Sequence, residues 1–144
     1  MYKRIMVPLD GSPRAERILP HIEALALKFD SKVIFLKVLE PSFIIQRPQN
    51  TEFENKIVRD AEEEANTYLS GWAGEFREKG MRSKGVVEHG TVVQAIITVA
   101  EREDAELIAM ASHGRSGLPQ VFYGSVAAGI LHRIDRPLLL IRSL

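Results

Sequence analysis

The residues best suited to chemistry form a glycine-rich segment between an apolar run and a helical pattern. The segment covers residues 110–117 and is followed by Gly124-Ser125. Glycine lets a backbone approach an anion closely, and the amides at the start of a helix donate hydrogen bonds to that anion. The segment therefore has the composition of a phosphate-binding loop. The same glycines would also serve a tight turn between a strand and a helix, and the segment alone does not separate the two interpretations.

A second polar group, Asp10-Gly11-Ser12, follows an apolar run at residues 5–9. The Asp10 carboxylate would repel a phosphate directly, but it suits a ribose hydroxyl as an acceptor, or a Mg²⁺ ion bound through water. An aspartate in this place is also common as a turn or helix-capping residue. Ser12 followed by Pro13 predicts a helix with serine as its N-cap and proline in its first turn.

Two familiar nucleotide-binding motifs are excluded. A dinucleotide-binding G-x-G-x-x-G pattern would follow the first strand, where this chain reads D-G-S-P-R-A. A P-loop needs G-x-x-x-x-G-K-[ST], and Gly124-Ser125 has neither that spacing from Gly117 nor the lysine. A nucleotide would therefore be held mainly by backbone amides.

The composition excludes several other classes of protein. The 144 residues include 19 basic and 19 acidic side chains, so no net charge attracts nucleic acid or an anionic membrane surface. The chain has no cysteine, which removes disulfides, thiolate nucleophiles and cysteine-based zinc sites. The apolar stretch near the start is too short for a signal peptide, and no run approaches the length of a membrane span. We expect a cytoplasmic protein with no nucleic-acid or membrane partner and no metal site of its own.

The apolar pattern alternates between strand-like and helix-like periods. Strand-like runs cover residues 5–9, 33–39, 83–88, 107–111 and 138–141, of which 83–88 is polar enough for a sheet edge. Helical patterns cover residues 13–29, with a kink at Pro20, and residues 51–80, 91–104 and 125–134. This alternation predicts one three-layer α/β domain over residues 1–144. Its five-stranded parallel sheet would have right-handed crossovers and helices on both faces.

A fold of this kind binds ligands outside the carboxyl ends of its strands, where the strand order reverses. Asp10 follows the first predicted strand, and the glycine-rich segment follows the fourth. If these strands are neighbours, both segments line one cleft. Phosphates would then lie on the backbone of Gly114, Gly117 and Gly124-Ser125, with the Ser125 hydroxyl as a further donor.

Several segments together resemble the universal stress protein family, and the resemblance spans nearly the whole chain. They are V-P-L-D-G-S at 7–12, the apolar run at 33–39, M-A-S-H-G-R-S-G-L at 110–118, G-S-V-A at 124–127 and R-P-L-L-L-I at 136–141. The resemblance implies a Rossmann-like fold of the HUP (adenine nucleotide alpha hydrolase-like) class, with strand order 3-2-1-4-5. It also implies a cytoplasmic homodimer paired through the last strand, Leu138 to Ile141, and, in one subgroup, bound ATP.

The ATP-binding subgroup is marked by the pattern G-x-x-G, nine residues, then G-[ST]. Gly114 and Gly124-Ser125 match this pattern, whereas Ala111 stands in place of the first glycine. A methyl group costs little at a strand end with negative φ, but positive φ would add strain of about 1–2 kcal/mol. We expect the negative φ.

The same resemblance implies a set of contacts for an adenine nucleotide, ATP with Mg²⁺ first and AMP or another adenine nucleotide as alternatives. The adenine would meet the backbone near Val38, and the ribose would meet Pro8 and Asp10. The remaining contacts would come from Met110, Ala111, Gly114, Arg115, Gly117, Gly124, Ser125 and Val126.

Catalysis has little support in the sequence. His113 is the one histidine beside the expected phosphates, and a role in shaping the loop suits it better than that of a general base. With no lysine in the loop, hydrolysis of ATP is expected to be slow or absent. The expected function is that of a nucleotide-sensing stress-response regulator that acts through its conformation or a partner. A slow ATPase and a dimeric interaction module that uses no nucleotide are the alternatives.

Overall fold

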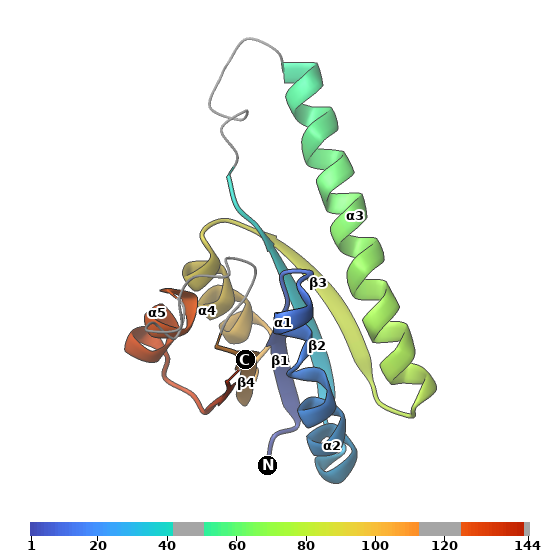
Figure 1. Cartoon of the computed structure of the whole chain (residues 1–144), viewed down its shortest axis with the longest axis vertical. Coiled ribbons are helices and arrows are strands. Elements are labelled where there is room, and N and C mark those ends of the chain that lie inside the picture. The colour runs from blue at the N-terminus through green and yellow to red at the C-terminus, as the bar shows by residue number, and fades with distance from the viewer. Residues whose placement is uncertain (42–50, 113–124, 143–144) are drawn as a thin grey trace.

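The computed structural model describes residues 1–41, 51–112 and 125–142. Its helices and strands alternate much as predicted (Figure 1). In chain order they are β1 (Arg4–Pro8), α1 (Pro13–Glu16), α2 (Leu19–Phe29), β2 (Lys32–Leu39), α3 (Thr51–Glu78), β3 (Ser83–His89), α4 (Val92–Arg102), β4 (Leu107–Ala111), α5 (Ser125–Arg133) and β5 (Leu138–Ile141). Among the described residues, no helix combines the length and apolar character that crossing a bilayer requires.

The strands form one parallel sheet in the order β3-β2-β1-β4-β5. This order confirms the predicted fold class, and it places β3 at one edge, as its polar sequence indicated. β2 is a central strand, paired with β1 from Lys32 to Leu36 and with β3 from Val33 to Leu39. β5 forms the other edge and pairs with β4.

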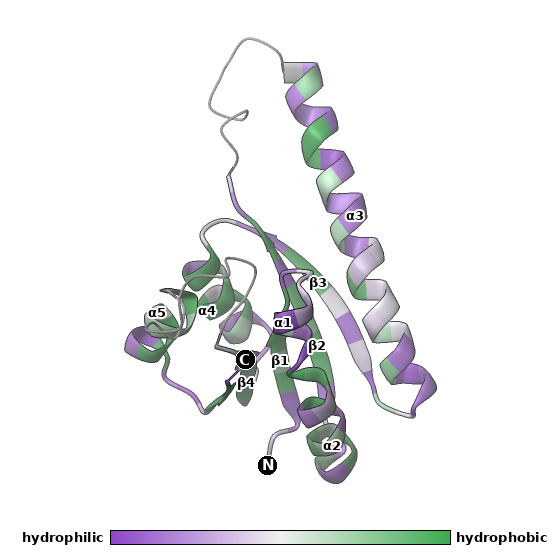
Figure 2. Ribbon diagram, in the orientation of Figure 1, coloured by the Kyte–Doolittle hydropathy of each residue, from purple (hydrophilic) through white to green (hydrophobic). Residues whose placement is uncertain are grey.

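Helices α1, α2 and α3 cover one face of the sheet, and α4 and α5 cover the other (Figure 1). Successive side chains of a strand point to opposite faces, so each face has its own hydrophobic core. The core under α1–α3 contains, among others, Val7, Ile22, Phe35, Leu69 and Phe76. The core under α4 and α5 contains Met6, Leu36, Ile96, Ile108 and Ile130. Figure 2 shows β1 and β4 as mostly hydrophobic, whereas β3 includes hydrophilic residues.

The single helix predicted over residues 13–29 is wrong, because the chain forms two helices there, α1 and α2. Arg17 caps the carboxyl end of α1, and Ile18 precedes the first residue of α2. Pro20 lies in the first turn of α2, where its missing N–H costs no hydrogen bond, because the first amides of a helix have no acceptor within it. The proline therefore begins a helix instead of kinking one.

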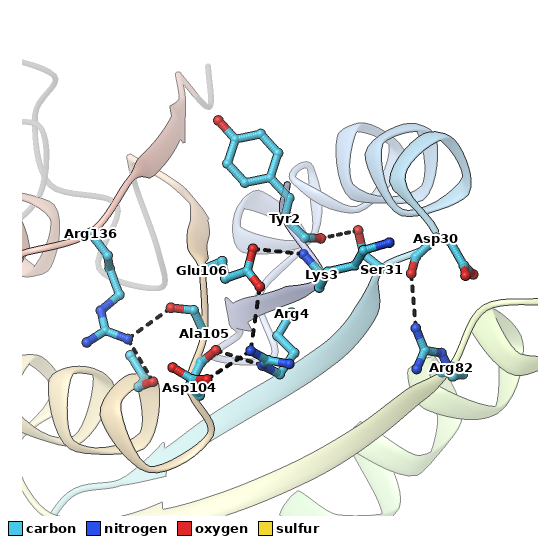
Figure 3. Close-up of polar contacts among 11 residues, drawn as sticks. Tyr2, Lys3, Arg4, Asp30, Ser31, Arg82, Asp104, Ala105, Glu106 and Arg136 are labelled. Carbon is cyan, nitrogen blue, oxygen red and sulfur yellow. Dashed lines mark hydrogen bonds and ion pairs between the residues drawn. The ribbon is translucent and has the colours of Figure 1, made fainter.

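Polar contacts join the elements at the amino ends of the strands, the edge opposite the predicted ligand site (Figure 3). An ion pair links Arg4 at the start of β1 to Asp104 beyond the end of α4, with 2.8 Å between Nη2 and Oδ2. The Arg136 Nη1 group donates to the backbone oxygens of Ala100 and Ala105, both at 2.9 Å. Arg136 thereby fixes the end of α4 to the segment that leads into β5.

Candidate functional site

The two polar segments predicted to bind a ligand follow strands that lie side by side. β1 and β4 are paired, with Ile5 level with Leu107 and Met6 level with Ile108. The chain leaves β1 towards β2 on one side and returns to β4 on the other, so the strand order reverses between β1 and β4. The β1–α1 turn and the end of β4 therefore belong to the same carboxyl edge of the sheet.

Side chains of the β1–α1 turn hold its backbone. Asp10 Oδ1 accepts a hydrogen bond from Ser12 N at 2.9 Å, and Ser12 Oγ accepts one from Ala15 N at 3.2 Å. Ser12 is thus the N-cap of α1, as predicted. Gly11 has a φ of +85°, a conformation that favours glycine. These contacts fix the Asp10 carboxylate at the carboxyl edge of the sheet.

Val38 presents its backbone to the same edge. Lys32 N donates to Lys3 O, just before β1, at 2.7 Å, and Leu36 O accepts from Leu9 N, just after β1, at 2.8 Å. The backbone polar groups of even-numbered residues in β2 therefore point towards β1. Val38 continues this series, but β1 has ended at Pro8. Its N–H and C=O therefore point into the space beyond the end of β1, where a ligand can meet both a donor and an acceptor.

Ala111 ends β4, opposite Ile141 of β5. It is not one of the described residues that have a positive φ, so its methyl group adds no backbone strain, as expected. The preceding Met110 is buried and packs in the core under α4 and α5. Alanine in place of the first glycine of the G-x-x-G pattern is therefore compatible with the backbone conformation at the end of β4.

The expected phosphate contacts are only partly within the described residues. Gly114, Arg115, Gly117 and Gly124 lie outside them, as does His113. Ser125 is the first residue of α5, and Val126 packs against the core under α4 and α5. Because α5 runs from the carboxyl end of β4 towards β5, its amino terminus, with the positive end of the helix dipole, belongs to the same carboxyl edge of the sheet.

A polar cluster behind the β1–α1 turn was missed by sequence reasoning. The Lys37 ammonium lies 5.2 Å from the centroid of the Tyr68 ring, and a Cβ on Gly11 would lie 3.5 Å from this ammonium. The Tyr68 hydroxyl donates to the Glu16 carboxylate. Burial raises the pKa of Tyr68, and the hydrogen bond to Glu16 and the charge of Asp10 raise it further. The one signal in the sequence was Lys37, a charged residue inside an otherwise apolar run.

The three described histidines lie on separate elements. His21 belongs to α2, His132 belongs to α5, and His89 at the end of β3 pairs with Glu62 of α3 at 2.7 Å. In the ranges that the structure covers, no three His, Cys, Asp or Glu side chains gather as a metal site.

Sequence comparison relates the chain to one family along almost its whole length. The model of the universal stress protein family matches residues 1–142. Universal stress protein MJ0577 of Methanocaldococcus jannaschii is 28% identical over 155 residues, covering 99% of this chain and 96% of the relative. The solved structure of MJ0577 superposes with a TM-score of 0.88 at 30% identity, covering 99% and 96% of the two chains.

Two other solved relatives contain nucleotides. One is a universal stress protein in complex with cAMP, with a TM-score of 0.65, 20% identity and coverage of 99% of this chain and 98% of that one. The other is the universal stress protein from Archaeoglobus fulgidus in complex with dAMP, with a TM-score of 0.67, 21% identity and coverage of 97% and 98%. At these identities the likeness concerns the fold. The match of the family model and the likeness to MJ0577 show that this chain belongs to the universal stress protein family.

Proposed function

We propose that this protein binds an adenine nucleotide, ATP with Mg²⁺ in the first place, at the carboxyl edge of β1 and β4. In this proposal it acts in the cytoplasm as a sensor or regulator in the stress response. The observation that supports the proposal is the pairing of β1 with β4 where the strand order reverses, since the Asp10 turn, the end of β2 at Val38 and the start of α5 all belong to that edge of the sheet. The cAMP and dAMP complexes of two relatives support an adenine ligand for the family fold.

Each part of the nucleotide has a matching group. The adenine edge carries an amino donor beside a ring-nitrogen acceptor, which complements the C=O and N–H of Val38. Asp10 accepts hydrogen bonds from the ribose hydroxyls, beside Pro8. The phosphates extend towards the amino terminus of α5, where Ser125 and Val126 supply amides and the helix dipole favours negative charge.

The donor set suits a Mg²⁺ ion that arrives with the triphosphate. Mg²⁺ keeps several of its waters and is usually held by one or two carboxylates together with phosphates. Asp10 is the carboxylate of the β1–α1 turn, and its Oδ1 already accepts a hydrogen bond from Ser12. Asp10 would hold the ion through one of the waters that Mg²⁺ keeps.

We further propose that two copies pair through β5. All four residues of Leu138–Ile141 are apolar and only half-buried in the single chain, at a sheet edge that invites pairing. The opposite edge, β3, differs because ion pairs anchor two of its charged side chains to the carboxyl end of α4 and its C-cap. Lys84 contacts Glu103 at 2.8 Å, and Glu88 contacts Arg102 at 2.7 Å. Antiparallel pairing of β5 with its copy would cover the apolar edge.

The nucleotide proposal is tested by releasing any small molecule from the purified protein and identifying it by mass, then titrating ATP with Mg²⁺ by calorimetry. We expect a bound or bindable adenine nucleotide. No released nucleotide, no heat and no thermal shift at millimolar ATP would refute the proposal.

Ser125→Ala tests the phosphate end of the site. It should weaken ATP by about 1–2 kcal/mol through the loss of one charge-assisted hydrogen bond, while adenosine, which has no phosphate, keeps its affinity. Equal losses for ATP and adenosine would show that the serine acts through the fold, and the phosphate assignment would be dropped.

A further inference from the structure

β2 carries a lysine in a row of apolar side chains. Val33 and Phe35 precede Lys37 at alternate positions on the same face of the sheet, and both are fully buried in the core under α1–α3. Lys37 continues this row and is half-buried. Because partial removal of an ammonium group from water costs free energy, the surroundings of Lys37 must compensate its charge.

The groups around Lys37 are of the kind that stabilise a cation. Its ammonium lies 5.2 Å from the centroid of the Tyr68 ring, within the range of a cation–π contact. The Tyr68 hydroxyl donates to the Glu16 carboxylate, and the negative charge of Asp10 is one of the causes that raise the pKa of the same tyrosine. The Lys37 ammonium and the Glu16 carboxylate thus both contact Tyr68, and the charge of Asp10 acts on the same residue.

Lys37 also packs against the β1–α1 turn, which holds Asp10 at the carboxyl edge of the sheet. Gly11 follows Asp10 directly, and a Cβ built on Gly11 would lie 3.5 Å from the Lys37 ammonium. The next residue of the strand, Val38, turns its own backbone to the space beyond β1. Lys37 therefore lies behind the Asp10 turn, and the next residue, Val38, presents its backbone to the carboxyl edge of the sheet.

We propose that Lys37 is a positioning residue of the nucleotide site, which holds the Asp10 carboxylate in the orientation that accepts hydrogen bonds from the sugar hydroxyls of the ligand. This inference rests on the proposed function. The attraction between ammonium and carboxylate restrains Asp10, which the phosphates of a nucleotide would otherwise repel. Lys37 acts from behind the β1–α1 turn, through Asp10. Its effect on ligand affinity therefore depends on the sugar hydroxyls that Asp10 binds.

The test compares adenosine with 2′,3′-dideoxyadenosine, which lacks both sugar hydroxyls, by calorimetric titration. Lys37→Met keeps the length of the side chain and removes its charge, and it should weaken adenosine about five- to tenfold while changing dideoxyadenosine less than about twofold. Lys37→Arg keeps the charge and should recover most of the adenosine affinity. Lys32→Met removes a half-buried lysine at the amino end of the same strand and should leave both ligands unchanged.

A double-mutant cycle isolates the coupling to Asp10. In an Asp10→Asn background, Lys37→Met should change adenosine affinity less than about twofold, because the carboxylate that it positions is gone. Equal losses for adenosine and dideoxyadenosine, an unchanged adenosine affinity in Lys37→Met, or an undiminished effect in the Asp10→Asn background would each overturn the proposed role. Wild-type protein that binds neither adenosine nor ATP would instead overturn the proposed function, and the role of Lys37 with it.

Discussion

Replacing Gly129 by alanine tests the packing that sets the position of α5. A Cβ at Gly129 would lie 2.7 Å from Val93 Cγ2 and 3.4 Å from Val93 Cγ1, too close for the two helices to keep their present separation. Val93 is β-branched and has essentially one χ1 rotamer in a helix, so it cannot turn away. Overpacking of this kind costs about 1–3 kcal/mol, against a gain of about 1 kcal/mol from replacing glycine by alanine in a helix. We expect a net loss of stability of up to about 2 kcal/mol.

The assay is equilibrium unfolding in urea, with a second helical glycine as the control. Gly74 in α3 has nothing within 4 Å of where its Cβ would lie, so Gly74→Ala should raise stability by about 0.5–1 kcal/mol. The two identical substitutions should therefore change stability with opposite signs. In a Val93→Ala background the obstructing methyl groups are gone, and Gly129→Ala should become stabilising as well.

A stabilising effect of Gly129→Ala in the wild-type background would refute the close approach of α4 and α5 at this position. So would a destabilising effect that persists unchanged when Val93 is alanine, because the cost would then arise somewhere other than in this contact.

Three further predictions concern the amino edge of the sheet, the β5 edge and the polar cluster behind the β1–α1 turn. Arg136→Met should cost about 2–3 kcal/mol, because the backbone oxygens of two buried residues, Ala100 and Ala105, lose a charged donor. Arg4→Met should cost less than about 1 kcal/mol, because both its ion pair and its hydrogen bond to Asp104 are exposed. Equal losses of unfolding free energy in urea would contradict this contrast. Leu140→Lys should shift a homodimer towards monomers in light scattering, and wild-type protein that is monomeric at micromolar concentration would rule out the pairing. Tyr68→Phe should cost about 1 kcal/mol near neutral pH. Because folding raises the pKa of Tyr68, the stabilising contribution of its hydroxyl is present below the unfolded pKa of about 10 and is lost as the pH rises above it. The difference in unfolding free energy between wild type and Tyr68→Phe should therefore narrow above pH 10. A difference that stays constant to pH 11 would refute the raised pKa of Tyr68.

The features that the sequence predicted correctly depend on local pattern. An uninterrupted apolar run bounded by Asp10 is enough to place β1 and its turn, and Ser12-Pro13 is enough to place the start of α1. The strand order came from the resemblance to a family. The break before α2 was missed because Pro20 is compatible both with a kinked helix and with the first turn of a new one.

The polar cluster behind the β1–α1 turn could not be predicted, because it joins residues far apart in the chain. Glu16 and Tyr68 are 52 positions apart, and each has an ordinary place on its own helix. Tyr68 followed the apolar period of α3, so its hydroxyl partner could not be foreseen. Gly129 likewise resembles a weak point of a helix in the sequence, whereas in the fold it is where α5 approaches Val93.

The two faces of the sheet support different halves of the proposed site, and this separation gives the variants distinct signatures. Lys37 and Tyr68 lie on the α1–α3 face, behind the turn that meets the sugar, whereas the contact of Gly129 with Val93 lies on the other face and positions the start of α5. Gly129→Ala should therefore weaken ATP more than adenosine, while Lys37→Met should weaken both ligands but spare dideoxyadenosine. Identical ligand profiles for the two variants would mean that both act by loosening the whole sheet, and the division of the site between its two faces would have to be abandoned.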